Sequence, residues 1–258
     1  MYLVKSCDER DNILIRKTIK IGSLTEYRDT EKEEIADKDE GYIFMTFNLS
    51  GIDLPAHLFN QMSSSFNSDN KFYTEELIVY PHSKLATDYL FIDKFKATAS
   101  LSKYNRFVFC ISLLEDPLEC KSIFKDYNDY WHIKLEDLEK VANEIAQSLI
   151  LTIGKRIQNG ESLFDREVTK DTLHLEWEAT QIKYTERNIQ IENKEVETNP
   201  KQVIDWLSHS YMLKPQKFRH EKEFRFVFDF YQNGRLLIPK INSIIIPADN
   251  IIPFVVAK

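Results

Sequence analysis

Residues 223–231 read EFRFVFDFY, and this stretch decides the fold class. Phenylalanine occupies every second position, at Phe224, Phe226, Phe228 and Phe230. Because successive side chains of a strand point to opposite faces, the four rings line one face, and Glu223 and Arg225 lie on the other. An aromatic face must be covered by another layer of the protein. The stretch therefore predicts a strand in a sheet that has a hydrophobic core on one side.

Outside this stretch, strand patterns outnumber long helical ones. Apolar residues at helical spacing over 135–149 predict a helix, and Asn199-Pro200 is typical of a helix start. Strands and helices do not alternate regularly, so we expect an α+β fold. The expected architecture is a single domain over 1–258 with a split, mostly antiparallel sheet flanked by helices. Residues 50–72 include NQMSSSFNSDN, which is polar and lacks periodicity, and predict a surface loop or insertion.

Glycine is scarce, with 6 residues in a chain of 258. About 18 would be expected at the usual frequency of roughly 7%. The sequence contains neither G-x-G-x-x-G nor G-x-x-x-x-G-K-[ST], the two commonest phosphate-binding loops. Any nucleotide must therefore be held mainly by side chains. The net charge of −7 argues against general electrostatic binding of nucleic acid and leaves a local basic patch open.

The cysteines and the apolar segments indicate the compartment. The three cysteines are far apart in the sequence and form no C-x-x-C, which fits a reducing cytoplasm: Cys7, Cys110 and Cys120. The first residues are charged and lack the apolar region of a signal peptide. No run of about 18 apolar residues is present. We therefore expect a cytoplasmic protein with no membrane partner.

The first candidate site is the segment 214–228. Its basic residues surround Glu221 and Glu223 and are Lys214, Lys217, Arg219, His220, Lys222 and Arg225. Glu223 and Arg225 share a strand face. A carboxylate on a rigid strand could stabilise positive charge at an anomeric carbon, while the cations hold phosphates. The same spacing is also typical of a salt-bridged polar face.

The second candidate follows a strand-to-helix turn at Gly22-Ser23. Tyr27 could stack on a base or a nicotinamide ring, and Arg28 could bind phosphate through two hydrogen bonds. Downstream carboxylates could bind a hard metal ion, although their spacing is not that of a calcium loop: Asp37, Asp39 and Glu40. The alternative is a solvated helix with ion pairs along its surface.

Two further patterns leave alternatives open. The aromatic run at Tyr127, Tyr130, Trp131 and His132 could wall a ligand pocket or belong to a core. Asp171 with Glu192-x-Lys194 could hold Mg²⁺ and activate water, as in a nuclease. Because H-E-x-x-H, Cys/His metal spacing and G-x-S-x-G are missing, zinc and serine hydrolases are disfavoured.

Three segments together resemble an uncharacterised bacterial domain family. They are L-x-x-Y-R ending at Arg28, F-C-I-S at 109–112 followed by Tyr130-Trp131, and the late E-x-E-F-R ending at Arg225. That family in turn resembles the ADP-ribosyltransferase superfamily, whose split sheet holds NAD without a glycine loop. The family's Arg or His on the first strand is not evident here, where Lys5 is the nearest cation.

The second resemblance implies roles for particular residues. Glu223 would be the catalytic carboxylate, Glu221 would orient the substrate, and Ser23 or Tyr27 would support the nicotinamide ribose. Arg28 and Arg225 would hold the diphosphate of NAD, and Tyr130 would complete the cofactor site.

These roles imply an ADP-ribosyltransferase-like enzyme that cleaves the nicotinamide–ribose bond of NAD, as a bacterial toxin or phage-defence effector with a protein or nucleic-acid target. One alternative is a non-catalytic module that binds a nucleotide, RNA or a protein through the basic segment and the aromatic run. The other is a Mg²⁺-dependent nuclease.

Overall fold

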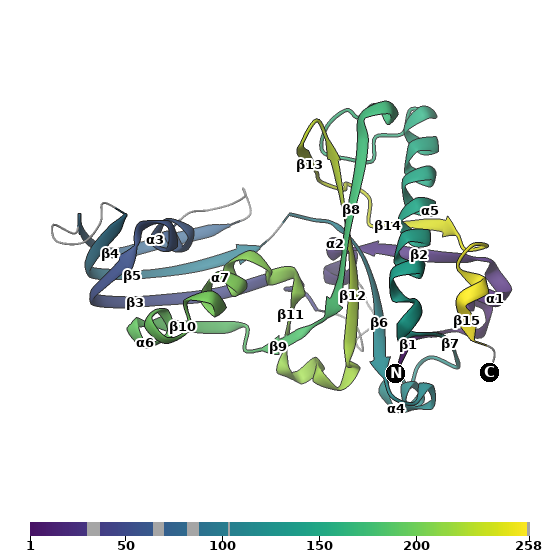
Figure 1. Cartoon of the computed structure of the whole chain (residues 1–258), viewed down its shortest axis with the longest axis horizontal. Coiled ribbons are helices and arrows are strands. Elements are labelled where there is room, and N and C mark those ends of the chain that lie inside the picture. Colours follow the sequence, from purple (N-terminus) through teal and green to yellow (C-terminus); the bar gives the residue numbers. More distant parts are fainter. Residues whose placement is uncertain (30–36, 64–69, 82–87, 103, 257–258) are drawn as a thin grey trace. The chain divides into compact units, whose positions relative to one another are not determined.

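The computed structural model describes residues 1–29, 37–63, 70–81, 88–102 and 104–256. Its class is α+β with mostly antiparallel sheets, as the sequence predicts (Figure 1). The predicted single domain differs from the observed division into two compact units. Unit 1 comprises residues 1–38, 105–182 and 217–258, and unit 2 comprises residues 39–104 and 183–216. The chain divides in this way because the two segments of unit 2 pack around a hydrophobic core of their own.

Unit 1 is built on a nine-stranded sheet whose strand pairs are antiparallel. Its main path is β13-β12-β6-β1-β7-β15, with β8 beside β12, and β2 joining β14 to β6. The strands are β1 (Tyr2–Cys7), β2 (Thr18–Ser23), β6 (Phe107–Leu114), β7 (Asp129–Lys134), β8 (Leu173–Gln181), β12 (Glu223–Gln232), β13 (Arg235–Leu237), β14 (Ser243–Pro247) and β15 (Val255–Val256).

The helices of unit 1 are mostly short. They are η1 (Glu9–Asp11), α1 (Ile13–Arg16), α2 (Leu24–Asp29), η2 (Pro117–Glu119), α4 (Cys120–Ile123), η3 (Leu135–Asp137), α5 (Leu138–Gln158), η4 (Lys170–Thr172) and η7 (Ile252–Phe254). A further 3₁₀ segment, η6 (Gln216–Glu221), leads into β12. Within the described chain, no helix is both long enough and apolar enough to cross a membrane.

The core of unit 1 lies between the phenylalanine face of β12 and helix α5. The predicted row at 224, 226, 228 and 230 is buried in one cluster with Val141, Ala142, Ile145 and Leu149 of α5. Ring contacts join the strands, with 5.9 Å between the centroids of Phe109 and Phe226. Burial of each such side chain contributes about 1.5–3 kcal/mol, so this face fixes which side of the sheet points inward. The predicted strand and helix faces are therefore confirmed.

The sheet of unit 1 is split beside β6. One edge of β6 pairs with β12 over residues 107–112. The other edge pairs with β1 over residues 112–114 and with β2 over residues 107–108. Residues 109–111 of β6 thus lie between two ladders, and we call this interval the split. Side chains that point away from the phenylalanine row at this place come from β6 and β12.

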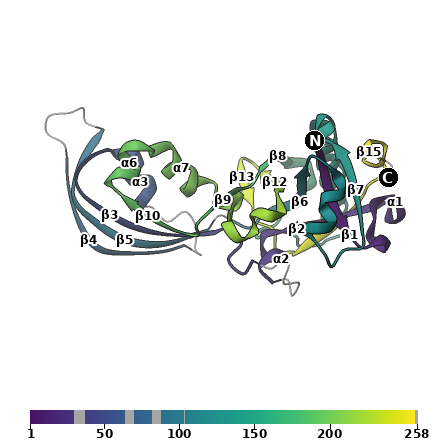
Figure 2. The same ribbon diagram turned by 90° about the horizontal axis from the view of Figure 1, so that it is seen from below.

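Unit 2 contains a four-stranded sheet in the order β10-β3-β5-β4, with helices on one side of it (Figure 2). The β10–β3 pair is parallel and the other pairs are antiparallel. Its strands are β3 (Tyr42–Pro55), β4 (Lys71–Pro81), β5 (Tyr89–Ser102) and β10 (Asn188–Glu192), with a separate pair of β9 (Lys183–Thr185) and β11 (Leu213–Pro215). Its helices are α3 (Ala56–Ser63), α6 (Asn193–Thr198), α7 (Pro200–Ser208) and η5 (Ser210–Met212).

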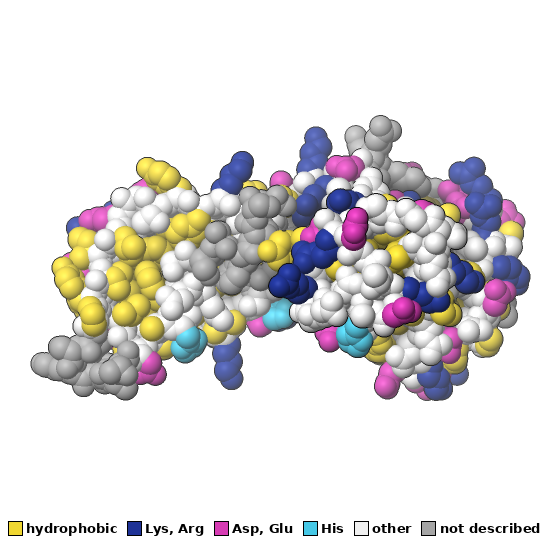
Figure 3. Space-filling model, turned by 90° about the horizontal axis from the view of Figure 1, so that it is seen from above, with side chains coloured by type: hydrophobic (Ala, Val, Ile, Leu, Met, Phe, Trp, Pro, Cys, Tyr) yellow, Lys and Arg dark blue, Asp and Glu magenta, His cyan; other side chains and the backbone are white. Residues whose placement is uncertain are grey.

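The outer surface of unit 2 is partly apolar. Tyr73, Leu77 and Tyr80 on β4 are each more than half exposed. Figure 3 shows hydrophobic side chains gathered on the part of the surface that unit 2 forms, while charged side chains of both signs are interspersed over unit 1. On the face that Figure 3 shows, hydrophobic side chains are therefore more concentrated on unit 2 than on unit 1.

The predicted loop over residues 50–72 is wrong for the described part of that range. Strand β3 continues to Pro55, and α3 follows directly. Leu58, Phe59 and Met62 are buried in the core of unit 2. Their spacing is helical, but polar residues between them hide the pattern at this short length. Residues 64–69, which hold most of the serine-rich run, lie outside the described residues.

Candidate functional site

Five side chains from separate parts of the chain meet at the split of unit 1. They are Lys5 of β1, Tyr27 of α2, Cys110 of β6, and Glu223 and Arg225 of β12, and we call them the split cluster. Lys5 Nζ donates a hydrogen bond to the Cys110 carbonyl over 2.9 Å. The Tyr27 hydroxyl is hydrogen-bonded to the Cys110 side chain and interacts electrostatically with Glu223 and Arg225. Arg225 lies directly opposite Cys110 in the β12–β6 ladder.

Glu223 and Arg225 form a buried ion pair. Arg225 Nε donates to Glu223 Oε1 over 2.7 Å, and an Nη2 atom lies 2.7 Å from the same oxygen. The two side chains are 5% and 1% exposed. A single charge at this depth is strongly destabilising, whereas a hydrogen-bonded partner of opposite sign offsets much of that penalty. The strand alternation that directs the phenylalanines inward thus directs a charged pair to the opposite face.

Lys5 brings a second cation to Glu223. Burial lowers the pKa of Lys5, while Cys110 and Glu223 act in the opposite direction and favour the charged amine. The Nζ atom also lies 5.4 Å from the centroid of the Phe109 ring, which attracts a cation electrostatically. The cluster therefore combines one carboxylate with two cationic side chains in a region of little water.

Tyr27 reaches the cluster because residue 22 is glycine. A Cβ atom at Gly22 would lie 3.1 Å from Cε2 of Tyr27, closer than most carbon contacts. The ring therefore packs directly over the backbone of β2. Burial raises the pKa of Tyr27 well above its usual value, and the contacts with Cys110 and Glu223 raise it further. The phenol is consequently protonated at neutral pH and acts as a hydrogen-bond donor.

Three other predicted residues lie close to the cluster along the chain. Ser23 is buried at the end of β2, and its Oγ accepts a hydrogen bond from the Glu26 amide over 3.4 Å. Arg28 is half-buried on α2, directly after Tyr27. Glu221 is buried in η6, and its carbonyl accepts a hydrogen bond from Ser112 Oγ over 2.7 Å. Ser23 and Glu221 thus hold the segments from which Tyr27 and Glu223 project.

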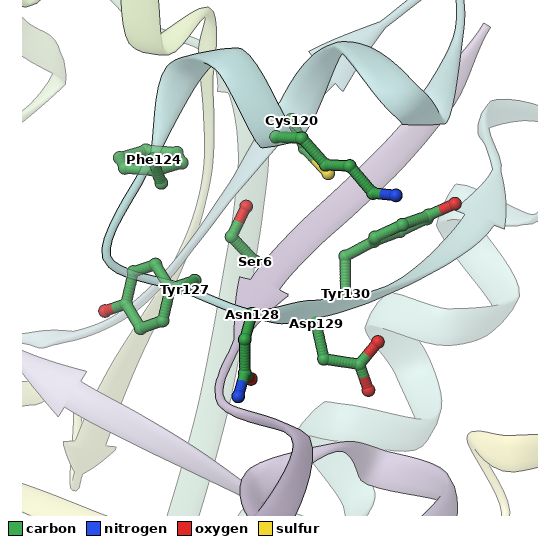
Figure 4. A pocket seen from close by; sticks show the side chains of 8 residues that line it. Ser6, Cys120, Phe124, Tyr127, Asn128, Asp129 and Tyr130 are labelled. Carbon is green, nitrogen blue, oxygen red and sulfur yellow. The ribbon is translucent and has the colours of Figure 1, made fainter.

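Tyr130 belongs to a different group of residues. It lies on β7, packs in one cluster with Val4, Leu114 and Cys120, and lines a pocket of about 260 Å³ (Figure 4). Tyr127 lines the same pocket, which is one of the two alternatives that the aromatic run leaves open. Trp131 points to the opposite face of the sheet, where its ring stacks on Phe109 at 6.2 Å. The structure thus brings Tyr27, Glu223 and Arg225 together and assigns Tyr130 to separate surroundings.

The basic segment does not form one exposed surface. Lys214 and Arg225 are buried, and Lys214 belongs to unit 2. Lys222 is paired with Glu119 over 2.6 Å. The remaining members are exposed on η6: Lys217, Arg219 and His220. The segment therefore divides between a buried site and a small exposed basic turn.

The residues suggested for metal binding are also divided. Asp171 and Asp37 belong to unit 1, whereas Asp39, Glu40, Glu192 and Lys194 belong to unit 2. In the described parts of the chain, no group of three or more His, Cys, Asp or Glu side chains is arranged to hold a metal ion. The split cluster is therefore the strongest candidate for chemistry.

Lys5 and Cys110 are the cluster members that reasoning from the sequence missed as site residues. Lys5 interrupts an otherwise uncharged strand, between Val4 and Ser6, and a cation in a mostly buried strand is a signal of a partner. Cys110 contributes its backbone carbonyl as well as its thiol. Because every residue has a backbone carbonyl, the residue type cannot indicate this role.

Comparison of the chain with models of known protein families, with curated proteins and with solved structures finds no match.

Proposed function

We propose that the chain is an ADP-ribosyltransferase-like enzyme that cleaves the nicotinamide–ribose bond of NAD at the split cluster. The observation that supports this most strongly is the convergence of Glu223, Tyr27 and Lys5 from β12, α2 and β1. Glu223 is the residue that the E-x-E resemblance implies as the catalytic carboxylate. A cation on the first strand, here Lys5, interacts electrostatically with it.

The chemistry requires negative charge close to the anomeric carbon. When the bond from ribose C1′ to the nicotinamide nitrogen breaks, the electron pair leaves with nicotinamide and positive charge develops on the ribose. A carboxylate held in fixed geometry away from water stabilises that charge. Glu223 meets both conditions, since Arg225 fixes its Oε1 and the side chain is 5% exposed. Water or an acceptor nucleophile then bonds to C1′ and releases a proton.

The two cations and the phenol supply substrate binding in this proposal. Lys5 and Arg225 are cationic, and in this proposal they attract the anionic diphosphate. Tyr27 offers a ring for stacking and a protonated hydroxyl. Arg28 extends the phosphate contacts, Ser23 supports the nicotinamide ribose, and Glu221 orients the substrate. Consumption of NAD in this way fits a bacterial toxin or phage-defence effector.

The test measures nicotinamide release by the purified full-length chain. NAD is supplied alone and with a bacterial lysate as a source of acceptors, and nicotinamide is quantified by chromatography. We expect Glu223→Gln to lower the rate at least about 100-fold, as does removal of an electrostatic group that stabilises a transition state. Tyr27→Phe leaves the Glu223–Arg225 pair in place and is expected to lower the rate without loss of folding.

The matched control is Glu176→Gln, which neutralises an exposed carboxylate on the neighbouring strand β8. It is expected to release nicotinamide at the wild-type rate. The proposal fails if the wild-type chain neither binds nor consumes NAD, or if Glu223→Gln is as active as wild type. Salt-sensitive binding of RNA or protein that Lys217→Glu weakens and Glu223→Gln leaves unchanged would instead indicate the non-catalytic module.

A further inference from the structure

The pocket that contains Tyr130 is a site in its own right. It lies on the face of the unit 1 sheet opposite the phenylalanine row, as the partners of Tyr130 show. Its wall is formed by Ser6 of β1, by Cys120, Lys121 and Phe124 in and beside α4, and by residues 127–130 (Figure 4). Its volume of about 260 Å³ is just below the range of about 300–1,000 Å³ typical of sites for drug-sized ligands. The pocket therefore fits one ring system and is too small for a whole dinucleotide.

Ser6 provides a polar group that is directed at this space. The residue is 8% exposed, and within the described chain its Oγ atom has no hydrogen-bond partner. Buried hydroxyls are nearly always paired, because an unpaired one has lost its bonds to water without replacement. Figure 4 shows this hydroxyl pointing from β1 into the space between α4 and residues 127–130. A ligand atom in the pocket would satisfy it.

Aromatic rings stand on two sides of the Ser6 hydroxyl. Phe124 and Tyr127 meet edge to face with 6.1 Å between their centroids, and Tyr130 stands on the other side. Tyr130 is itself stacked on His132 at 6.0 Å, which holds its ring in place. Aromatic walls around one hydrogen-bonding group are the usual means of recognising a planar heterocycle.

The polar residues of the wall favour a neutral ligand. Lys121 and Asp129 carry opposite charges. Asp129 Oδ2 accepts a hydrogen bond from Asn12 Nδ2 over 2.6 Å, and Asn128 Oδ1 accepts one from the Glu9 amide over 2.8 Å. These bonds tie residues 128–129 to the segment around η1, so the wall is held in position before any ligand binds.

We propose that this pocket binds a single neutral nitrogen heterocycle, a free nucleobase or nicotinamide, whose ring packs against the aromatic walls and whose carbonyl or ring nitrogen accepts a hydrogen bond from Ser6. The inference is independent of the proposed enzymatic activity, because it depends on residues of β1, α4 and β7 outside the split cluster.

The test is calorimetric titration of the full-length chain with adenine, uracil and nicotinamide separately, which distinguishes nucleobases from the nicotinamide source. Cyclohexanecarboxamide, which has an amide but no aromatic ring, is the control ligand. At least one heterocycle is expected to bind saturably at one site per chain. Ser6→Ala is expected to weaken that binding about tenfold, the value of one hydrogen bond, and Tyr127→Ala to abolish it.

Ser6→Ala also has a second readout. Because Oγ has no partner in the described chain, its removal is expected to leave the melting temperature unchanged or higher. Ser122→Ala on α4 is the matched control, since that exposed hydroxyl donates to the Glu119 carbonyl and does not line the pocket. It is expected to bind the heterocycle as wild type does.

Three results would overturn the proposal: no saturable binding of any of the three heterocycles, equal affinity in Ser6→Ala and wild type, or a clear fall in the melting temperature of Ser6→Ala. Loss of nicotinamide release in Glu223→Gln with heterocycle binding retained would support the independence of the two sites. Conversely, a wild-type chain that binds a heterocycle but leaves NAD intact would refute the enzymatic proposal and keep this one.

Discussion

Arg225 and Glu223 project from the same face of β12, and Arg225 Nε donates to Glu223 Oε1 over 2.7 Å. The opposite face of the strand carries the four phenylalanines of the core. One ten-residue strand therefore separates the hydrophobic core of unit 1 from a buried ion pair. Because the Arg225 and Glu223 side chains are 1% and 5% exposed, the two members of the pair depend on each other for stability.

The ion pair predicts strong coupling between its two positions. Arg225→Met leaves the Glu223 carboxylate without the guanidinium and is expected to cost about 3–5 kcal/mol, the usual range for breaking a buried pair from one side. Glu223→Leu is expected to be similarly destabilising. The double variant removes both charges and should cost less than the sum of the single variants. Urea denaturation of the four proteins measures this, and additivity within about 0.5 kcal/mol would contradict it.

Lys5 predicts a dependence of stability on alkaline pH. Burial lowers the pKa of Lys5 below the 10.5 of an exposed lysine. Between that lowered pKa and 10.5, the unfolded chain binds a proton that the native chain does not. The contribution of Lys5 to the free energy of unfolding therefore becomes more favourable as pH rises through this window. Lys5→Met lacks this contribution, so wild type should gain stability relative to the variant between neutral pH and pH 10.5.

The measurement for Lys5 is a series of urea titrations at increasing pH. Lys134→Met, which removes an exposed lysine of β7, is the control. Its free energy of unfolding should change with pH in the same way as that of the wild type. If the free energy of unfolding of Lys5→Met also changed with pH as that of the wild type does, Lys5 would have the same pKa in the native and the unfolded chain.

Gly22 and Gly154 predict opposite effects of the same substitution. The Cβ of Gly22→Ala would lie 2.5 Å from Oε2 of Glu26 and 3.1 Å from Cε2 of Tyr27. Glu26 can move away, but the Tyr27 ring must shift, so we expect a loss of about 1–3 kcal/mol. Gly154 lies within α5, and the three atoms nearest to a Cβ there all belong to the flexible side chain of Lys170, the first at 3.4 Å. Gly154→Ala should stabilise by roughly 0.5–1 kcal/mol, because alanine favours the helix.

Thermal and urea unfolding measure the stability of both alanine variants relative to the wild type. Gly22→Ala should also lower nicotinamide release if Tyr27 acts as proposed, whereas Gly154→Ala should not. Equal stability of Gly22→Ala and wild type would mean that Tyr27 does not pack over β2 as described.

Local patterns account for the elements that could be predicted from the sequence. The phenylalanine row and the apolar face of α5 repeat every few residues, so their periodicity can be recognised without tertiary contacts. The start of α7 is marked by the proline at position 200, which is also a local signal. The order of strands is different. Val4 pairs with Ser112 and Gly22 with Val108, and such distant pairings leave no local signal. For the same reason, the sequence predicts a split sheet but not the position of the split beside β6, and it does not predict the division into two units.

The candidate site shows the same division between local and distant information. Glu223 and Arg225 could be placed on one face by alternation alone. Their approach to Tyr27 depends on α2 following a strand that pairs with β6, which only the assembled sheet reveals. The Cys110 carbonyl becomes a partner of Lys5 because it lies between two ladders, and that property belongs to the fold.

Helix α3 provides the test of the segment that the sequence predicted as a loop. Leu58 is 2% exposed in the core of unit 2, so Leu58→Ala should lower the free energy of unfolding of that unit by about 2–5 kcal/mol. His57 is the adjacent, exposed residue, and His57→Ala should change the free energy of unfolding by less than about 0.5 kcal/mol. Urea unfolding of both variants decides between a surface loop and a packed helix. Near-equal stability of Leu58→Ala and His57→Ala would favour a surface loop, whereas a large difference requires that the helix contribute to a packed core.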